Sequence, residues 1–120
     1  MNLSTKLFAV ASLFVATNAW AVDQQRSFGE MTGSACTGNV VPETSGGVQI
    51  FGFTNAARRL TWEVWSVDEF GTVTRELSRT ARWIDETVEP VDGLEYYACV
   101  VRSGTTAQDF DVSINSQAIE

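Results

Sequence analysis

The stretch Leu60-Thr61-Trp62-Glu63-Val64-Trp65-Ser66-Val67 decides the fold, because hydrophobic and polar residues alternate along it. A period of two predicts a β-strand with two unlike faces, since successive side chains point to opposite sides. One face carries Leu60, Trp62 and Val64, and the other carries Thr61, Glu63 and Trp65.

The neighbouring segments extend this pattern. Asp68-Glu69-Phe70-Gly71 is predicted to be a hairpin loop in which Gly71 takes a positive φ at little cost, and residues 72–77 form the returning strand. Upstream, Val48–Phe53 is hydrophobic on both faces, which is typical of a central strand. Weaker patterns predict short strands at residues 27–31 and 38–41.

Two more strands are predicted in the last third of the chain. Leu94–Arg102 has the pattern of a strand that is buried on both sides. Asp109–Asn115 alternates, and its inward-facing residues are Phe110, Val112 and Ile114.

Residues 74–85 fit two structures. Their β-branched start favours a strand, whereas Leu77, Ala81 and Ile84 have helical spacing. We favour the strand. About seven short strands separated by turn residues then predict an all-β fold, an antiparallel β-sandwich or a jelly-roll-like barrel.

The first 21 residues have the pattern of a secretory signal peptide. Lys6 precedes a hydrophobic run at residues 7–15, and Ala19-Trp20-Ala21 has the small-x-small form that signal peptidase accepts. This run is shorter than the roughly 20 residues that span a bilayer. We expect a cleaved signal peptide at 1–21, a single domain at 22–120, and a periplasmic or secreted protein without membrane insertion after cleavage.

Cleavage after Ala21 would change the charge and leave both cysteines in the domain. The remaining seven arginines and fifteen carboxylates give −8, compared with −7 for the whole chain. This charge repels nucleic acid and anionic lipid and favours a basic partner, although solubility alone would also account for it. In an oxidising compartment, Cys36 and Cys99 are predicted to form a disulfide; the alternative, a redox-active dithiol, has no C-x-x-C motif.

The composition excludes several catalytic classes. The chain has no histidine, and its single lysine, Lys6, would leave with the signal peptide. Ser-His-Asp, Cys-His and Ser-Lys systems, His-bearing zinc sites and lysine Schiff bases are therefore excluded from the domain. The remaining carboxylate chemistry would need a cleft for which so small a domain has little room. We expect no enzymatic activity and no cofactor.

Trp65 is the main candidate for binding, together with Glu63 and Thr61 on the same face. An exposed indole can stack on a sugar or anchor a protein contact. The alternative is that a second layer covers Trp65, since Val67 shares its face. Trp62 and Trp83 are interpreted as core residues.

Two charged clusters are interpreted as solvated surface. Asp85, Glu86, Glu89 and Asp92 surround a turn but lack EF-hand spacing, so we expect no metal site. Arginines can bind anions bidentately. Against fifteen acids we expect them to form surface ion pairs instead; these arginines are Arg58, Arg59, Arg75, Arg79 and Arg82.

Residues 48–114 resemble the small β-sandwich domains of exported bacterial proteins, of the pre-peptidase C-terminal type. The similarity lies in the order of Phe53, Asn55-Ala56-Ala57, residues 60–64, residues 91–97, residues 100–102 and residues 110–114. Periplasmic inhibitors of g-type lysozyme have a similar architecture, and their partners are often basic.

A second resemblance concerns Tyr97-Ala98-Cys99, which follows the Asp92-Gly93 turn and is similar to the tyrosine-corner strand of immunoglobulin-like domains. Trp62 and Trp65 lie further beyond Cys36 than the core tryptophan of those domains usually does.

These observations together predict an exported, non-catalytic binding domain for a protein or carbohydrate. Its most specific form is an acidic ligand or inhibitor of a basic protein such as a lysozyme. The alternatives are a self-assembling structural subunit of an extracellular appendage and a carbohydrate-binding module.

Overall fold

The computed structural model describes residues 19–42, 46–102, 104 and 106–119. Residues 1–18 of the predicted signal peptide lie outside this part of the chain. The described residues form eight strands: β1 (Ala19–Met31), β2 (Ser34–Cys36), β3 (Val48–Phe53), β4 (Leu60–Val67), β5 (Val73–Ala81), β6 (Trp83–Val88), β7 (Glu95–Val101) and β8 (Gln108–Ile119).

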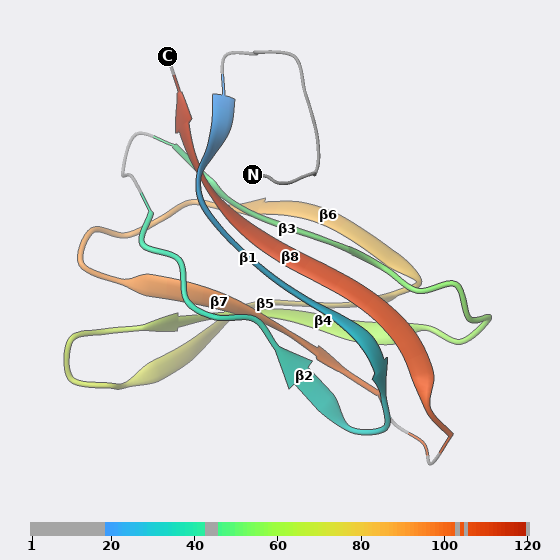
Figure 1. Ribbon diagram of the computed structural model, residues 1–120. Coiled ribbons are helices and arrows are strands. Elements are labelled where there is room, and N and C mark those ends of the chain that lie inside the picture. Colours follow the sequence, from blue (N-terminus) through green and yellow to red (C-terminus); the bar gives the residue numbers. More distant parts are fainter. Residues whose placement is uncertain (1–18, 43–45, 103, 105, 120) are drawn as a thin grey trace.

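The strands form two antiparallel sheets that pack face to face as a β-sandwich. The first sheet has the order β1-β8-β3-β6, and the second has the order β2-β7-β4-β5. In Figure 1 the first sheet lies above the second, and the β1 and β2 edges face the viewer. The predicted all-β sandwich is confirmed, with eight described strands where the sequence indicated about seven.

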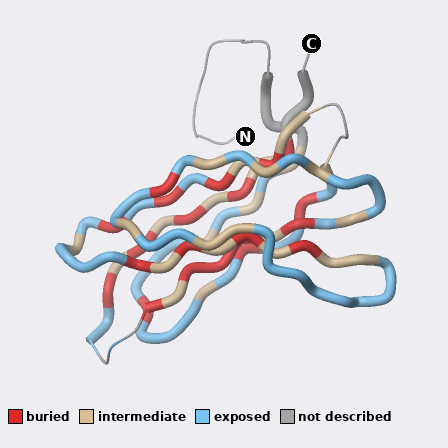
Figure 2. Tube along the Cα trace, turned by 180° about the vertical axis from the view of Figure 1, so that it is seen from behind, coloured by how far each residue is buried: buried red, intermediate tan, exposed pale blue. Residues whose placement is uncertain are grey.

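The core lies between the sheets and is built by strand alternation. Along β4 every second residue is buried, from Leu60 to Ser66, and Phe110, Val112 and Ile114 of β8 face inward as predicted. Figure 2 shows the same alternation of buried and more exposed positions along neighbouring strands. Trp62 is fully buried, which confirms its predicted place in the core.

Trp62 requires a glycine in the facing sheet. Its Nε1 donates a hydrogen bond to the carbonyl oxygen of Ala81 (2.9 Å), so the buried polar atom is satisfied. Its six-membered ring lies against Gly52 of β3, where an added Cβ would be only 2.6 Å from Cζ3. The missing side chain at Gly52 therefore makes room for the largest buried side chain in the described core.

The ambiguous segment 74–85 is extended, as favoured, and it changes sheets. β5 pairs with β4 in the second sheet, whereas β6 pairs with β3 in the first. Arg82 is the single residue between these strands. The helical spacing of Leu77, Ala81 and Ile84 arises because both strands turn hydrophobic residues toward one shared core.

The predicted hairpin is present, whereas one of the two weakly predicted short strands is absent from the described residues. In the β4–β5 hairpin, Asp68 Oδ1 accepts hydrogen bonds from the amides of Phe70 and Thr72, both at 2.9 Å, and Gly71 has a φ of 84°. The strand predicted at residues 38–41 is wrong, because only an isolated bridge joins Val40 to Tyr96 there. The strand predicted at 27–31 is the end of the longer β1.

The predicted disulfide is confirmed. Cys36 and Cys99 lie opposite each other in the β2–β7 register, with Cα atoms 4.0 Å apart, and their sulfurs are bonded. The bond joins two strands of one sheet, whereas the immunoglobulin disulfide joins two sheets. The resemblance to a tyrosine corner also names the wrong residue. The hydroxyl of Tyr96, and not that of Tyr97, accepts a hydrogen bond from the Val91 amide (2.9 Å).

The predicted cleavage point falls inside β1. Ala19, Trp20 and Ala21 pair with residues 117–119 of β8, and the register shifts between Ala21 and Asp23. A cut after Ala21 would therefore remove only the pairs that precede this irregularity. The described residues include no helix of the length and hydrophobicity needed to cross a membrane.

Candidate functional site

The candidate site predicted from sequence lies on the outer face of the second sheet. Thr61, Glu63 and Trp65 are all half-buried there, and Tyr97 and Arg75 flank Trp65 on the neighbouring strands. The structure thus brings the three predicted residues to one open face of β4.

The polar groups of this face bond mainly to one another. Trp65 Nε1 donates to Glu63 Oε1 (3.0 Å), and the other oxygen of that carboxylate lies 3.5 Å from Arg75 Nη1. The hydroxyls of Thr61 and Thr80 are 3.0 Å apart. These contacts occupy the Trp65 indole nitrogen, both oxygens of Glu63 and the Thr61 hydroxyl, and a binding role for the three residues stays a prediction.

A different surface gathers exposed aromatic side chains. We define the aromatic face as Phe28, Phe51, Phe53 and Trp83 on the outer side of the first sheet. Their exposed fractions are 67%, 44%, 39% and 66%. Phe53 lies directly opposite Trp83, and Phe28 continues the same row beyond Asp111 of β8.

The exposure of Trp83 corrects its predicted place in the core. The inward residue at the start of β6 is Ile84, which is buried, so Trp83 points outward. Phe51 and Phe53 face outward for the same reason, because Ile50 and Gly52 take the inward positions of β3. The prediction of a central strand is confirmed by the place of β3 between β8 and β6, and among the described residues no second layer covers Phe51 and Phe53.

The aromatic face also carries an excess of carboxylates. By strand alternation, Glu30, Asp85, Asp109 and Asp111 share it with Arg26. Arg26 forms an ion pair with Asp111 (Nη2 to Oδ2, 2.6 Å), and its guanidinium lies 4.6 Å from the ring centroid of Phe28. The hydrogen bond to Asp111 raises the pKa of Arg26, partly opposed by desolvation, so this cation stays charged.

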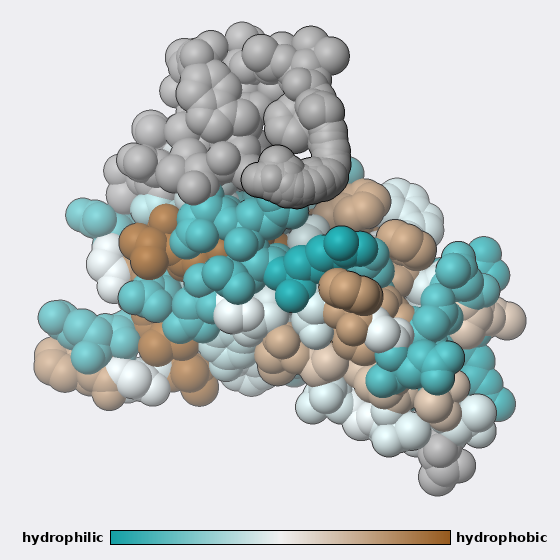
Figure 3. All heavy atoms as spheres, viewed as in Figure 1, coloured by the Kyte–Doolittle hydropathy of each residue, from teal (hydrophilic) through white to brown (hydrophobic). Residues whose placement is uncertain are grey.

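On the side of the molecule that carries the β1 and β2 edges, the exposed hydrophobic side chains are separated from one another. Viewed toward β1 and β2, Figure 3 shows hydrophilic side chains between separate hydrophobic ones over the described part of the molecule. Single exposed hydrophobic residues of this kind are ordinary on soluble domains. The clustering of four aromatic rings on one sheet face is therefore the feature that needs an explanation.

The acidic cluster predicted as solvated surface is spread over β6 and the loop after it. Asp85 and Glu86 point to opposite sides of β6; Asp85 accepts a hydrogen bond from Gln49 (2.8 Å), and Glu86 lies 3.8 Å from Arg79. Within the described ranges, no three histidine, cysteine, aspartate or glutamate side chains lie close enough to hold a metal ion.

Comparison with known proteins identifies no family for this chain. No family model matches it, and no curated protein or solved structure shows significant similarity to it. The resemblances to pre-peptidase C-terminal and immunoglobulin-like domains therefore reduce to the shared sandwich architecture. Since one fold serves many functions, the sandwich alone assigns none, and the chemistry of its surfaces is what distinguishes them.

Proposed function

We propose that this protein is a non-catalytic binding domain that recognises a basic protein through the aromatic face. The observation that carries the proposal is the placement of Phe28, Phe51, Phe53 and Trp83, each 39–67% exposed, on one side of the first sheet. Aromatic side chains on such surfaces supply much of the binding energy in protein interfaces.

The charge of the surface and of the molecule supports a basic partner. Four carboxylates and one guanidinium share the aromatic face, and the whole chain has a net charge of −7. A negative surface attracts a basic protein over long distances and speeds the encounter. Lysine or arginine side chains of the partner could also stack on the exposed rings.

The first prediction tests the aromatic face with purified basic proteins, including c-type and g-type lysozymes. Replacing Phe51 and Trp83 with threonine keeps the β-propensity of β3 and β6 while removing two anchors. We expect binding to weaken by at least about tenfold, because central aromatic anchors each contribute more than about 1 kcal/mol. Calorimetry at about 0.02 M and about 0.5 M NaCl would also show weaker binding at high salt.

The matched control is Phe70→Thr. Phe70 is 85% exposed but lies in the β4–β5 hairpin loop, away from the aromatic face. This variant should bind like the unmodified protein and unfold at the same temperature. Equal loss in both variants, or no salt-sensitive binding to any basic protein, would overturn the proposal.

Self-assembly is a separate candidate that two edge strands favour. β1 and β5 lie at edges of the two sheets, and most residues of β5 are exposed. Unpaired edges of this length can pair with another chain. Size-exclusion chromatography with light scattering distinguishes the two functions: a monomer supports the binding domain, and large regular assemblies support the appendage subunit.

A further inference from the structure

Four of the seven arginines of the chain lie at one end of the sandwich. Arg58 and Arg59 are in the loop between β3 and β4, Arg82 joins β5 to β6, and Arg102 follows β7. We call this set the arginine end. Hydrogen bonds hold these segments together: the Thr54 amide donates to the Arg82 carbonyl (2.9 Å), and Gln108 Nε2 donates to the Arg58 carbonyl (2.8 Å).

These arginines differ from the other three in their partners. Arg26, Arg75 and Arg79 form ion pairs with Asp111, Glu63 and Glu86, as expected for surface arginines. Among the described residues, no carboxylate lies within ion-pair distance of the arginine end. Asp109 lies nearby, but its carboxylate accepts hydrogen bonds from the Thr54 hydroxyl and the Asn55 amide.

Arg102 is the most informative member, because it is only 7% exposed. Its Nη1 donates to Gln108 Oε1 (2.6 Å), and its Nε donates to the Thr106 carbonyl. Both acceptors are neutral oxygens. A buried guanidinium normally has a carboxylate partner, because burial without a counter-charge is costly. Here the positive charge is fixed in position and left uncompensated by the described residues.

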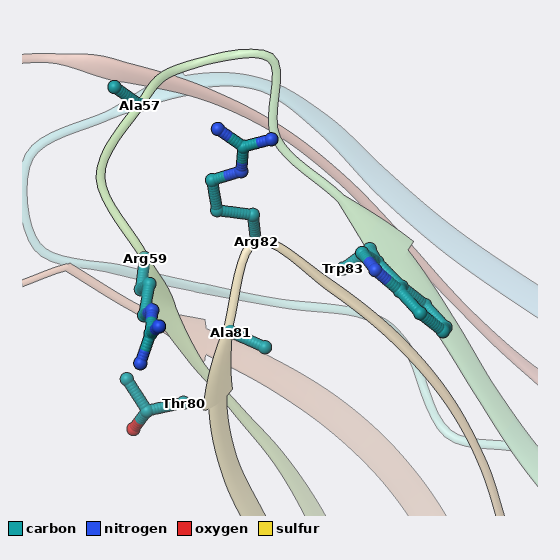
Figure 4. Close-up of a pocket in the computed structure, with 6 residues that line it drawn as sticks. All are labelled: Ala57, Arg59, Thr80, Ala81, Arg82 and Trp83. Atoms are coloured by element: carbon teal, nitrogen blue, oxygen red, sulfur yellow. The ribbon is translucent and has the colours of Figure 1, made fainter.

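Two open depressions lie beside the β3–β4 loop, and Ala57 lines both. Arg58, Arg102 and Thr106 line one, of about 330 Å³, and Arg59, Arg82 and Trp83 line the other, of about 560 Å³. In Figure 4 the side chains of Arg59 and Arg82 extend in different directions, and the Trp83 indole points away from both. The positive charges are therefore spread over the end of the molecule and do not converge on one small anion.

We propose that the arginine end binds an acidic polysaccharide, a sugar chain that carries carboxylate or sulfate groups. Guanidinium groups bind such anions bidentately, and spaced cations match a polymer with one anionic group at intervals. The Thr106 residue lines the depression beside Arg58 and Arg102, and its hydroxyl is suited to hydrogen bonds with sugar hydroxyls. The net charge of −7 opposes the binding of any polyanion, so the contacts at the arginine end must distinguish a sugar chain from nucleic acid.

The second prediction uses heparin as a sulfated probe and polygalacturonate as a carboxylated probe. The double variant Arg59→Gln, Arg82→Gln should bind both probes at least about tenfold more weakly at about 0.05 M NaCl. Because both side chains are exposed, the variant should keep the melting temperature of the unmodified protein. If the unmodified protein binds only one of the two probes, that probe shows whether sulfate or carboxylate groups are recognised.

The matched control is Arg75→Gln, Arg79→Gln. It removes the same two charges, so it changes long-range repulsion equally, but its arginines lie on β5 in ion pairs. It should bind the probes within about twofold of the unmodified protein. The proposal would be overturned by equal weakening in both variants, or by no binding of either probe. It would also be overturned if polyglutamate and single-stranded DNA bound as tightly as the two polysaccharides. Trp83 borders the larger depression and also belongs to the aromatic face, but neither double variant changes it, so these results are distinguishable from those on Phe51 and Trp83.

Discussion

At the residue scale, Gly52 makes the packing of Trp62 possible. The third prediction is that Gly52→Ala destabilises the protein by about 1–3 kcal/mol, because the new methyl group would overlap the buried indole. The added Cβ would also lie 3.0 Å from the Asp111 carbonyl oxygen, which belongs to the backbone and cannot move aside easily. Thermal unfolding should show a loss of about 4–8 °C for each kcal/mol.

Gly33→Ala is the control for that substitution. An added Cβ at Gly33 meets no heavy atom within 4 Å, and the residue does not have a positive φ. The control should therefore melt close to the unmodified protein or slightly above it, since alanine restricts the unfolded chain. Equal melting temperatures for the two variants would show that the core tolerates a side chain at Gly52.

At the scale of an element, β2 is attached by few contacts. It has three residues, pairs only with β7, and is joined to it by the Cys36–Cys99 disulfide, whose sequence separation is 63. The fourth prediction is that replacing both cysteines with alanine lowers the free energy of unfolding by about 4 kcal/mol, because the bridge restricts the unfolded chain.

Urea denaturation measures this change, and the reduced, unmodified protein should behave like the double variant. Hydrogen exchange should show faster opening at residues 34–36 than in the central strands, because β2 lies at a sheet edge. An unchanged urea midpoint after reduction would show that the bridge contributes nothing to stability.

At the scale of the whole molecule, the boundary of the domain falls within β1. The fifth prediction is that a chain beginning at Val22 unfolds cooperatively and within about 3 °C of one beginning at Ala19, because frayed strand ends contribute little. Nine pairs, from Asp23 to Met31, would remain with β8. Differential scanning calorimetry gives the comparison. A chain beginning at Ser27 is the contrast, because it also loses pairs beyond the irregularity and should melt well below both.

How much the sequence could predict depends on what alternation can report. Hydrophobic periodicity within single strands identified Trp62 and Phe110 as core residues. The disulfide was predictable because the domain has only two cysteines and an oxidising compartment would pair them. It placed Trp83 in the core wrongly, because periodicity separates two faces of a strand without showing which one a second sheet covers. In a two-layer sandwich each sheet has a single covered face, so outward aromatic residues look like core residues in the sequence.

The arginine end could not be predicted for a different reason. Arg58, Arg82 and Arg102 are far apart in the chain, and the order of strands in two sheets is what brings their loops together. The expectation of surface ion pairs was confirmed for Arg75 and Arg79, whose partners lie on neighbouring strands or across the sheets. It was wrong for Arg58, Arg59 and Arg82 among the described residues.

The pairing of β1 with β8 also determines how the domain would respond to force. Ala19 lies opposite Ile119, so the two ends of the described chain leave side by side (Figure 1). Tension between them would unzip the two strands one hydrogen-bonded pair at a time and would not load all pairs together. A domain joined to neighbours through both ends would therefore extend at low force. This mechanical weakness suits a module that docks on a partner better than a link in a load-bearing fibre.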